Sequence, residues 1–220
     1  MAKRNQGCEI KLGILVYEPP RVGPTLWEIG IPDRTAAEFY VPDANPMLLN
    51  RLYINRPDKF RQYGLWERYG ELYPDQDLIY KAGVSDYRTD WFYAHVTRNT
   101  GNGKYEATTW KILFELQNVV KAGTYKLRLA LAAASISELQ VRFNDQHANP
   151  PHFTTGLIGK DNAIARHGIH GLYWLYHIDV PSSQLLTGSN TIFLTQSRTS
   201  GPFAGLMYDY IRFEGPPGKN

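Results

Sequence analysis

Residues 105–116 read YEATTWKILFEL, and residues 125–131 read YKLRLAL. In the first stretch every second residue from Trp110 onward is apolar, and in the second a tyrosine and three leucines alternate with lysine, arginine and alanine. A period of two indicates a β-strand, because successive side chains of a strand point to opposite faces. Turn residues at 121–123 separate the two stretches. The pair therefore predicts two half-buried strands and an all-β chain.

Short apolar stretches separated by turn residues extend this pattern in both directions. The further strands that we expect are 27–31, 37–40, 91–96, 136–143, 172–180, 191–195 and 208–213. A single helix is predicted, opening at Pro57, broken or short because of Gly64 and Gly70, and ending before Pro74. Many short strands with one weak helix predict an antiparallel β-sandwich of the jelly-roll type. Long loops are expected around 41–50, 74–90 and 144–170, where binding residues usually lie.

The first residues of the chain differ from the rest. Residues 9–17 predict one strand, which Pro19 and Pro20 end. A lone strand cannot form a domain, so it is either the last strand of a preceding domain or an edge strand of the main sheet. We expect residues 1–23 to be a tail with this strand, and residues 24–220 to be the main domain.

Composition excludes several classes of protein. The chain has 220 residues, a net charge of +3 and no basic run beyond Lys3-Arg4, so a nucleic-acid partner is not expected. No stretch reaches the roughly 20 apolar residues of a membrane helix, and Cys8 is the one cysteine, so no internal disulfide forms. The start lacks the apolar core of a signal peptide. Alone, these features place the chain inside a cell, but a piece of a secreted protein has the same features.

Six ungapped stretches carry a resemblance to the C-terminal domain of plant rhamnogalacturonan lyases of polysaccharide lyase family 4. They are LWEIGIPDRTAAEF at 26–39, FRQYGLWERY at 60–69, GVSDY at 83–87 with DWF at 90–92, ARHGIHGLY at 165–173, and MYDYIR at 207–212. Together they span about 24–214 and occur in the family's order.

The resemblance implies a fold and a task. The family's enzymes have a catalytic N-terminal β-sandwich, a small fibronectin-III-like domain, and a last jelly-roll domain that is similar to galactose-binding-like carbohydrate-binding modules. Residues 9–20 then resemble the end of the middle domain, and 24–220 the third domain. The catalytic Lys and His of the family belong to its N-terminal domain, so no catalytic residue is carried over. The implied task is to bind rhamnogalacturonan I of pectin in the plant cell wall, outside the cell, or to dock on the catalytic domain of the parent lyase.

Aromatic faces beside cations are the residue types that an acidic sugar requires. Aromatic rings stack on the apolar C–H face of a pyranose, and Arg or Lys pairs with a uronate carboxylate. Two clusters combine these types, and they supply our candidate sugar-binding residues: Tyr63, Trp66, Arg68 and Tyr69 in one, and Arg166, His167, His170, Tyr173 and Trp174 in the other. Trp91 and Trp110, which lie within alternating strands, are expected in the core.

The histidines of the second cluster admit three interpretations. They are structural, hydrogen-bonded to backbone carbonyls; they contact sugar; or they act as the base and acid of a lyase. The structural interpretation is favoured because such histidines are common. Two histidines alone do not complete a zinc site, so neither a metal site nor a catalytic residue is expected here.

Acidic residues supply one weaker hypothesis. The carboxylates of a loop-rich stretch either form a solvated acidic loop, which we take as the default, or hold a structural Ca²⁺; they are Asp75, Asp77, Asp86 and Asp90, with Asp209 and Glu214 as similar candidates. No cofactor is required for a binding function. Asp33 and Arg34 are expected to form a local ion pair that fixes a turn.

Two other functions stay open at this point. The chain is an active rhamnogalacturonan lyase that cleaves its substrate by β-elimination, or it is a structural or lectin-like interaction protein. Unsaturated uronate absorbance on incubation with the polymer distinguishes the first alternative. The second alternative is distinguished if no pectic sugar changes the stability of the chain.

Overall fold

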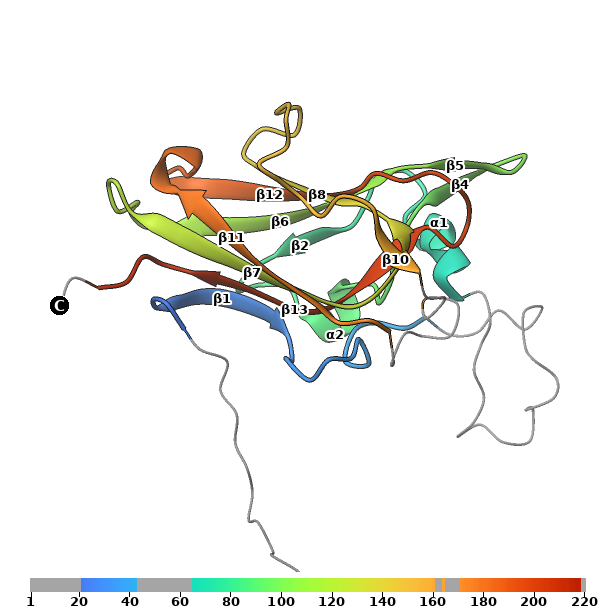
Figure 1. Ribbon diagram of the computed structural model, residues 1–220, viewed down its shortest axis with the longest axis horizontal. Helices are drawn as coiled ribbons and strands as arrows, with labels where there is room; N and C mark the ends of the chain where they lie inside the picture. Colours follow the sequence, from blue (N-terminus) through green and yellow to red (C-terminus); the bar gives the residue numbers. More distant parts are fainter. Residues whose placement is uncertain (1–20, 43–64, 161–163, 165–170, 219–220) are drawn as a thin grey trace, which may run out of the picture.

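The computed structural model describes residues 21–42, 65–160, 164 and 171–218. Two β-sheets face each other and form a sandwich, with a small hairpin at one end and the short helix at 69–72 beside it (Figure 1). The expected β-sandwich with a short helical stretch is therefore confirmed. The strand expected at 9–17 and the first part of the helix expected from Pro57 lie outside the described residues.

The first sheet has six strands in the order β1-β13-β7-β10, with β11 also pairing with β7 and β3 with β13. Every pair in it is antiparallel. Its strands are β1 (Thr25–Gly30), β3 (His95–Val96), β7 (Thr124–Ser137), β10 (Ile158–Lys160), β11 (Trp174–Pro181) and β13 (Gly205–Glu214).

The second sheet has five strands in the order β2-β6-β12-β8-β9. They are β2 (Ile79–Lys81), β6 (Thr108–Leu116), β8 (Leu139–Phe143), β9 (Phe153–Thr154) and β12 (Gly188–Gln196). The pairs β6–β12, β12–β8 and β8–β9 are antiparallel, but β2 pairs with β6 in parallel, which the sequence did not indicate. The long strands β6, β7 and β8 alternate between the two sheets, as do β11, β12 and β13, which is the connection pattern that a jelly roll requires.

The remaining elements are short. Strands β4 (Arg98–Gly101) and β5 (Lys104–Glu106) form the hairpin, and the helical elements are η3 (Leu65–Arg68), α1 (Tyr69–Leu72), α2 (Tyr87–Asp90) and η5 (Ser182–Gln184). No helix in these ranges is long and apolar enough to cross a membrane.

Several predicted strands differ from the observed ones. Residues 37–40 form no strand: only Tyr40 pairs, in a single bridge with Phe92, because the chain turns at 33–38. The strand expected at 91–96 shrinks to β3, and the one expected to begin at Tyr105 is split at Ala107 into β5 and β6. Strand β7 continues to Ser137 and includes the first two residues of the strand expected at 136–143, so β8 begins at Leu139. The second half of β7 is buried on both faces, so the alternation that marks a half-buried strand is missing there.

Aromatic rings fill the space between the sheets. Trp91 and Trp110 are fully buried and meet edge to face with their ring centroids 5.2 Å apart, so their predicted place in the core is confirmed. Tyr208 of β13 meets Trp91 edge to face at 5.2 Å, and the ring of His95 stacks on Trp110 at 4.1 Å. Such pairs contribute beyond the area they bury because ring edges and faces carry opposite partial charge.

Tyr69 satisfies the polar atoms within this aromatic layer. Its side chain is fully buried, and its hydroxyl accepts a hydrogen bond from Nε1 of Trp110 at 2.9 Å. The same hydroxyl donates to Oδ1 of Asp77 at 2.9 Å. Asp77 also accepts from Arg98 and from the backbone amide of Thr109, so one carboxylate joins the helix α1, the hairpin and β6.

We predict that Tyr69→Phe destabilises the fold. The substitution leaves the buried indole N–H of Trp110 without its acceptor, which costs about 1–3 kcal/mol of unfolding free energy. Chemical denaturation measures the loss. Tyr105→Phe, on the β4–β5 hairpin, is the matched control and is expected to change the unfolding free energy by less than about 0.5 kcal/mol. Equal stability of the two variants would contradict the role given to Tyr69.

His95 makes stability depend on pH. Burial lowers its pKa to about 3 from the ordinary 6.5, against the opposing effects of Asp77 and of the hydrogen bond to the carbonyl of Thr108. The unfolded chain therefore binds a proton at His95 between pH 6.5 and 3 that the folded chain does not. The stabilisation by the neutral ring is complete above pH 6.5 and is lost as pH falls through this window, by up to about 1.4 kcal/mol per pH unit.

We predict that His95→Gln, which retains a donor and an acceptor, makes the loss of stability between pH 6 and 4 less steep. Glu38 and Asp209 act in the opposite direction, since burial raises their pKa values to about 7 and about 6 and their protonation favours the folded state. The effect of His95 is therefore measured as the difference between the denaturation curves of the variant and the original chain at each pH. Parallel pH profiles for the two proteins would disprove the assignment.

Candidate functional site

The first predicted cluster lies largely in the core. Tyr63 lies outside the described residues. Trp66 is 2% exposed and packs on Phe203, and Tyr69 is fully buried, so neither ring presents a face to a ligand in this structure. Arg68 is partly exposed and pairs with Glu71 at 3.1 Å. The glycine-interrupted helix pattern did not reveal this burial, because the ring contacts come from strands far away in the sequence.

The second predicted cluster is described only in part. Arg166, His167 and His170 lie outside the described residues. Trp174 opens β11, and its half-buried ring packs against the core. Tyr173 lies under the guanidinium of Arg34, whose carbon is 5.0 Å from the ring centroid, and both side chains border the turn at 31–34.

This turn is held by Asp209 of β13. The carboxylate oxygen Oδ1 of Asp209 accepts hydrogen bonds from the backbone amides of Asp33 at 3.2 Å and Arg34 at 2.7 Å. Burial raises the pKa of Asp209 to about 6, although the amide of Arg34 and the Tyr173 hydroxyl lower it. An ion pair between Asp33 and Arg34 was expected to fix this turn, and the structure shows that Asp209 holds it through the two backbone amides.

The acidic loop has structural partners as well. The side chain of Asp86 caps α2 by accepting from the amide of Arg88 at 3.0 Å, and Asp90 accepts from the amide of Asp86 at 2.9 Å. Asp77 belongs to the core network around Tyr69. Among the described residues, no group of three His, Cys, Asp or Glu side chains is placed to hold a metal ion.

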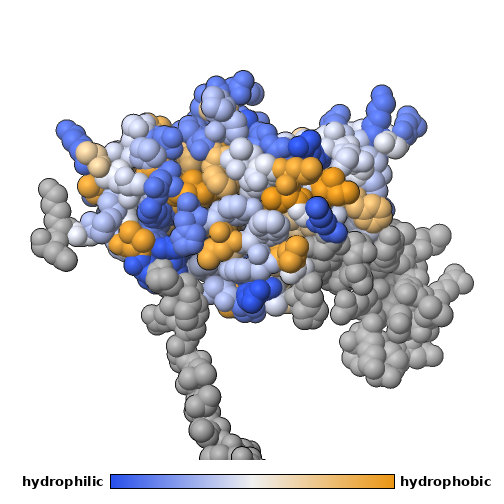
Figure 2. Space-filling view, in the orientation of Figure 1, coloured by the Kyte–Doolittle hydropathy of each residue, from blue (hydrophilic) through white to orange (hydrophobic). Residues whose placement is uncertain are grey.

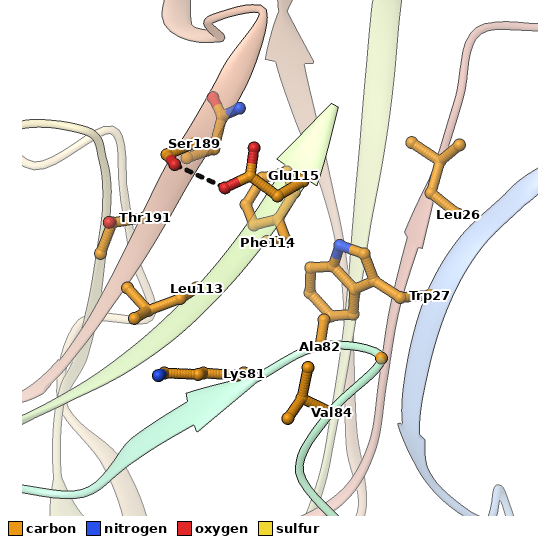
Figure 3. Close-up of a pocket in the computed structure, with 12 residues that line it drawn as sticks. Leu26, Trp27, Lys81, Ala82, Val84, Leu113, Phe114, Glu115, Ser189 and Thr191 are labelled. Carbon is orange, nitrogen blue, oxygen red and sulfur yellow. Dashed lines mark hydrogen bonds between the residues drawn. The ribbon is translucent and has the colours of Figure 1, made fainter. Parts of the chain in front are cut away.

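A groove at the edge of the sandwich is a concave site in the described part of the chain. It consists of two adjoining hollows of about 460 and 450 Å³. Leu26, Trp27 and Glu115 line both hollows, and we call the pair the Trp27 groove. The first hollow is completed by Lys81, Ala82, Gly83, Val84, Leu113, Phe114, Ser189, Asn190 and Thr191 (Figure 3). The second is completed by Pro24, Leu116, Gln117, Asn118, Val120, Tyr125, Gly215 and Pro216.

Strand pairing positions Trp27. The register of β1 against β13 shifts between Thr25 and Trp27, so that Leu26 is an extra residue. A bulge of this kind bends a strand and redirects its side chains. The indole packs on Phe213 and on Phe114 with ring centroids 5.5 Å apart in both cases. Trp27 is therefore anchored to both sheets while another part of the ring faces the groove (Figure 3).

Glu115 provides the polar side of the groove. It is the last residue but one of β6 and is exposed, and its Oε1 accepts a hydrogen bond from Oγ of Ser189 at 2.5 Å (Figure 3). The amine of Lys81 extends away from the indole (Figure 3). The rim is apolar and open: Val84 is 81% exposed, and Leu26 and Val120 are also exposed.

The groove has the size and residue types of a small-ligand site. Ligand pockets usually enclose about 300–1,000 Å³ and combine apolar walls with a few polar groups. A ring anchored from behind can stack on the C–H face of a sugar, while a carboxylate accepts hydroxyl hydrogens. The face of the molecule in Figure 2 is mostly hydrophilic with separate hydrophobic patches. Apolar surface on that face is thus not gathered into one large area.

Sequence reasoning missed this groove. Trp27 was assigned to a strand but not singled out, and Glu115 was one of the outward residues of an alternating strand. The alternation indicated that Glu115 is exposed. Nothing in the sequence indicates that residues 27, 84, 115 and 189 meet, because it is the pairing of β6 with β12 and the packing of β1 of the other sheet against them that bring these residues together.

Comparison with known proteins gives one strong match. A family model described as "CBM-like: Polysaccharide lyase family 4, domain III" matches residues 25–213. No curated protein matches the chain. Similar solved structures include a family 35 carbohydrate-binding module from an environmental isolate, at 18% identity, a TM-score of 0.31, and coverage of 56% of this chain and 78% of the module. The CBM35 from Cellvibrio japonicus Abf62 has 16% identity with the same TM-score and coverage.

Proposed function

The chain belongs to the CBM-like domain III family of polysaccharide lyase family 4, and from this premise we propose that it is a non-catalytic carbohydrate-binding module whose Trp27 groove holds a pectic polysaccharide. The observation that carries the proposal is an indole anchored to both sheets and facing a groove beside a carboxylate. A rigid ring loses little conformational entropy on binding. Little of the favourable free energy of its contact with a sugar is therefore offset by the cost of ordering the side chain.

The ligand that we propose is rhamnogalacturonan I. The resemblance of residues 26–39, 60–69 and 207–212 to plant rhamnogalacturonan lyases supports this choice, and the family match supports a place beside a lyase catalytic domain. The module then concentrates the polymer near that domain. Binding at both places on one chain raises the effective concentration of substrate at the catalytic site.

Catalysis by this chain alone is not part of the proposal. A lyase base must reach the C5 proton of a uronate and be unprotonated near neutral pH. His95 is neutral, because burial lowers its pKa to about 3, but it is fully buried and bonded to Tyr208 and to the carbonyl of Thr108. It therefore cannot reach a polymer on the surface.

We predict that Trp27→Ala lowers the affinity for rhamnogalacturonan I oligosaccharides about tenfold, since an aromatic contact contributes about 0.5–1.5 kcal/mol beyond its buried area. Titration calorimetry measures the change. Trp27→Phe keeps a ring against Phe114 and Phe213 and is expected to retain part of the affinity. Thermal unfolding of both variants shows whether the sandwich remains folded.

Trp174→Ala is the matched control, because Trp174 is the other half-buried tryptophan and was a candidate on sequence grounds. It is expected to bind oligosaccharide as the original chain does. Loss of binding in Trp174→Ala with full binding in Trp27→Ala would move the site to the second predicted cluster. Absence of binding by the original chain would refute the carbohydrate-binding function itself.

A further inference from the structure

Building on the proposed function, we infer that the Trp27 groove selects uncharged pyranose units and disfavours uronates, with Glu115 as the residue that makes this distinction. The inference concerns the sugar that lies in the groove, and not the polymer as a whole. A polymer in which neutral and acidic sugars alternate can still bind under this preference, because one of its neutral units can lie on Trp27. The position, the bonding and the surroundings of Glu115 carry the inference.

Glu115 lies where the two hollows meet. Its side chain lines both of them together with Leu26 and Trp27, so a sugar on the indole in either hollow approaches the carboxylate. The residue is exposed next to the last residue of β6, and Figure 3 shows its carboxylate directed toward Ser189, in the same hollow as the indole of Trp27. A ligand therefore meets this charge wherever it stacks on Trp27.

Ser189 fixes the hydrogen-bonding character of this corner. Its hydroxyl donates its single hydrogen to Oε1 of Glu115 at 2.5 Å. A serine hydroxyl has one hydrogen to donate and two lone pairs, and an ionised carboxylate only accepts. The Ser189–Glu115 pair thus presents acceptors to a ligand. Sugar hydroxyls are donors and match it, whereas the carboxylate of a uronate is an acceptor and does not.

The charges around the groove act in the same direction. Of the residues that line the two hollows, Glu115 and Lys81 are the charged ones. Lys81 lines the first hollow but not the second, and its amine extends away from Trp27 (Figure 3). A site for a uronate needs an Arg or Lys facing the carboxylate. Here the one charged side chain that lines both hollows together with the indole is negative, so a uronate on the ring is repelled.

The apolar walls complete the match. Leu26 and Val84 are exposed beside the indole, and Ala82 lies next to them in the first hollow (Figure 3). Such surfaces accept the C–H face of a pyranose or a methyl substituent, and they offer no partner to a charged group. The groove is therefore complementary to a neutral sugar on both its apolar and its polar sides.

Three oligosaccharides of equal length test the selectivity by titration calorimetry: a neutral β-galactan, the alternating rhamnogalacturonan I backbone, and an all-uronate galacturonan. We expect the first two to bind at least about fivefold more tightly than galacturonan at low ionic strength, from repulsion by one partly screened charge. The gap is expected to narrow at 0.5 M salt, because screening weakens that repulsion. Galacturonan that binds as tightly as the other two at low salt overturns the inference, and so does a gap that salt leaves unchanged.

Glu115→Gln provides the mutational test. It keeps an acceptor at the same place and removes the charge, so neutral sugars are expected to bind about threefold more weakly and galacturonan more tightly. The ratio of the two affinities then falls toward one. Glu106→Gln, which removes the same charge from the exposed β5 strand outside the groove, is the matched control and leaves the ratio unchanged. An unchanged ratio in Glu115→Gln contradicts the role of Glu115.

The carbohydrate-binding function and the selectivity for neutral sugars are contradicted by different results. If none of the three oligosaccharides binds, both the carbohydrate-binding function and the selectivity are refuted. If rhamnogalacturonan I binds but galacturonan binds equally well, or if the neutral galactan alone fails to bind, the function stands and the selectivity is wrong.

Discussion

The packing of aromatic rings between two sheets is the constraint on which the structure depends. Trp110 touches His95, Tyr69, Trp91 and Tyr208, and its one polar atom is satisfied by the hydroxyl of Tyr69. The layer continues to the other end of the sandwich, where Phe114 and Phe213 face each other at 5.1 Å and Trp27 rests on both. Trp27 thus packs against the aromatic core and also lines the groove. The contacts that stabilise the fold also fix the orientation of the Trp27 indole. A ligand that stacks on this ring therefore pays no further entropic cost for ordering it.

Carboxylates have two different roles in this sandwich. Glu214 is fully buried, and its Oε1 accepts from both Arg128 at 2.8 Å and Arg212 at 2.7 Å, while its Oε2 accepts from the amide of Val22 at 2.8 Å. Burial by itself raises its pKa, but these hydrogen bonds outweigh burial and keep the pKa below its ordinary value. Glu115 is exposed, and a neutral hydroxyl holds it in place. A paired, buried charge organises the sheet, whereas a charge held by a hydroxyl at a groove is available to a ligand.

The sequence predicted those parts of the fold in which local pattern and tertiary environment agree. The alternation from Trp110 to Leu116 marks β6 correctly, because one face of that strand is buried and the other is not. The strand at 208–213 was also predicted and lies within β13, but the sequence did not indicate that both of its faces are covered, so that Asp209, Arg212 and Glu214 are buried despite their charges. Tyr69 was a candidate sugar-binding residue because it lies beside Arg68 in an aromatic and basic cluster, but it is fully buried. The groove brings Trp27 together with Glu115 and Ser189, which lie 88 and 162 positions further along the chain, and no local sequence pattern predicts that these residues meet.

The central claim is that a pectic sugar lies on Trp27. The chain has five tryptophans, and each indole N–H gives its own signal in a nuclear magnetic resonance spectrum of the ¹⁵N-labelled protein. The measurement follows these five signals while rhamnogalacturonan I oligosaccharide is added. We predict a saturable shift of the Trp27 signal, with much smaller changes for the buried Trp66, Trp91 and Trp110 and for Trp174 outside the groove. A shift of Trp174 with an unchanged Trp27 signal would contradict the account, and so would five unchanged signals.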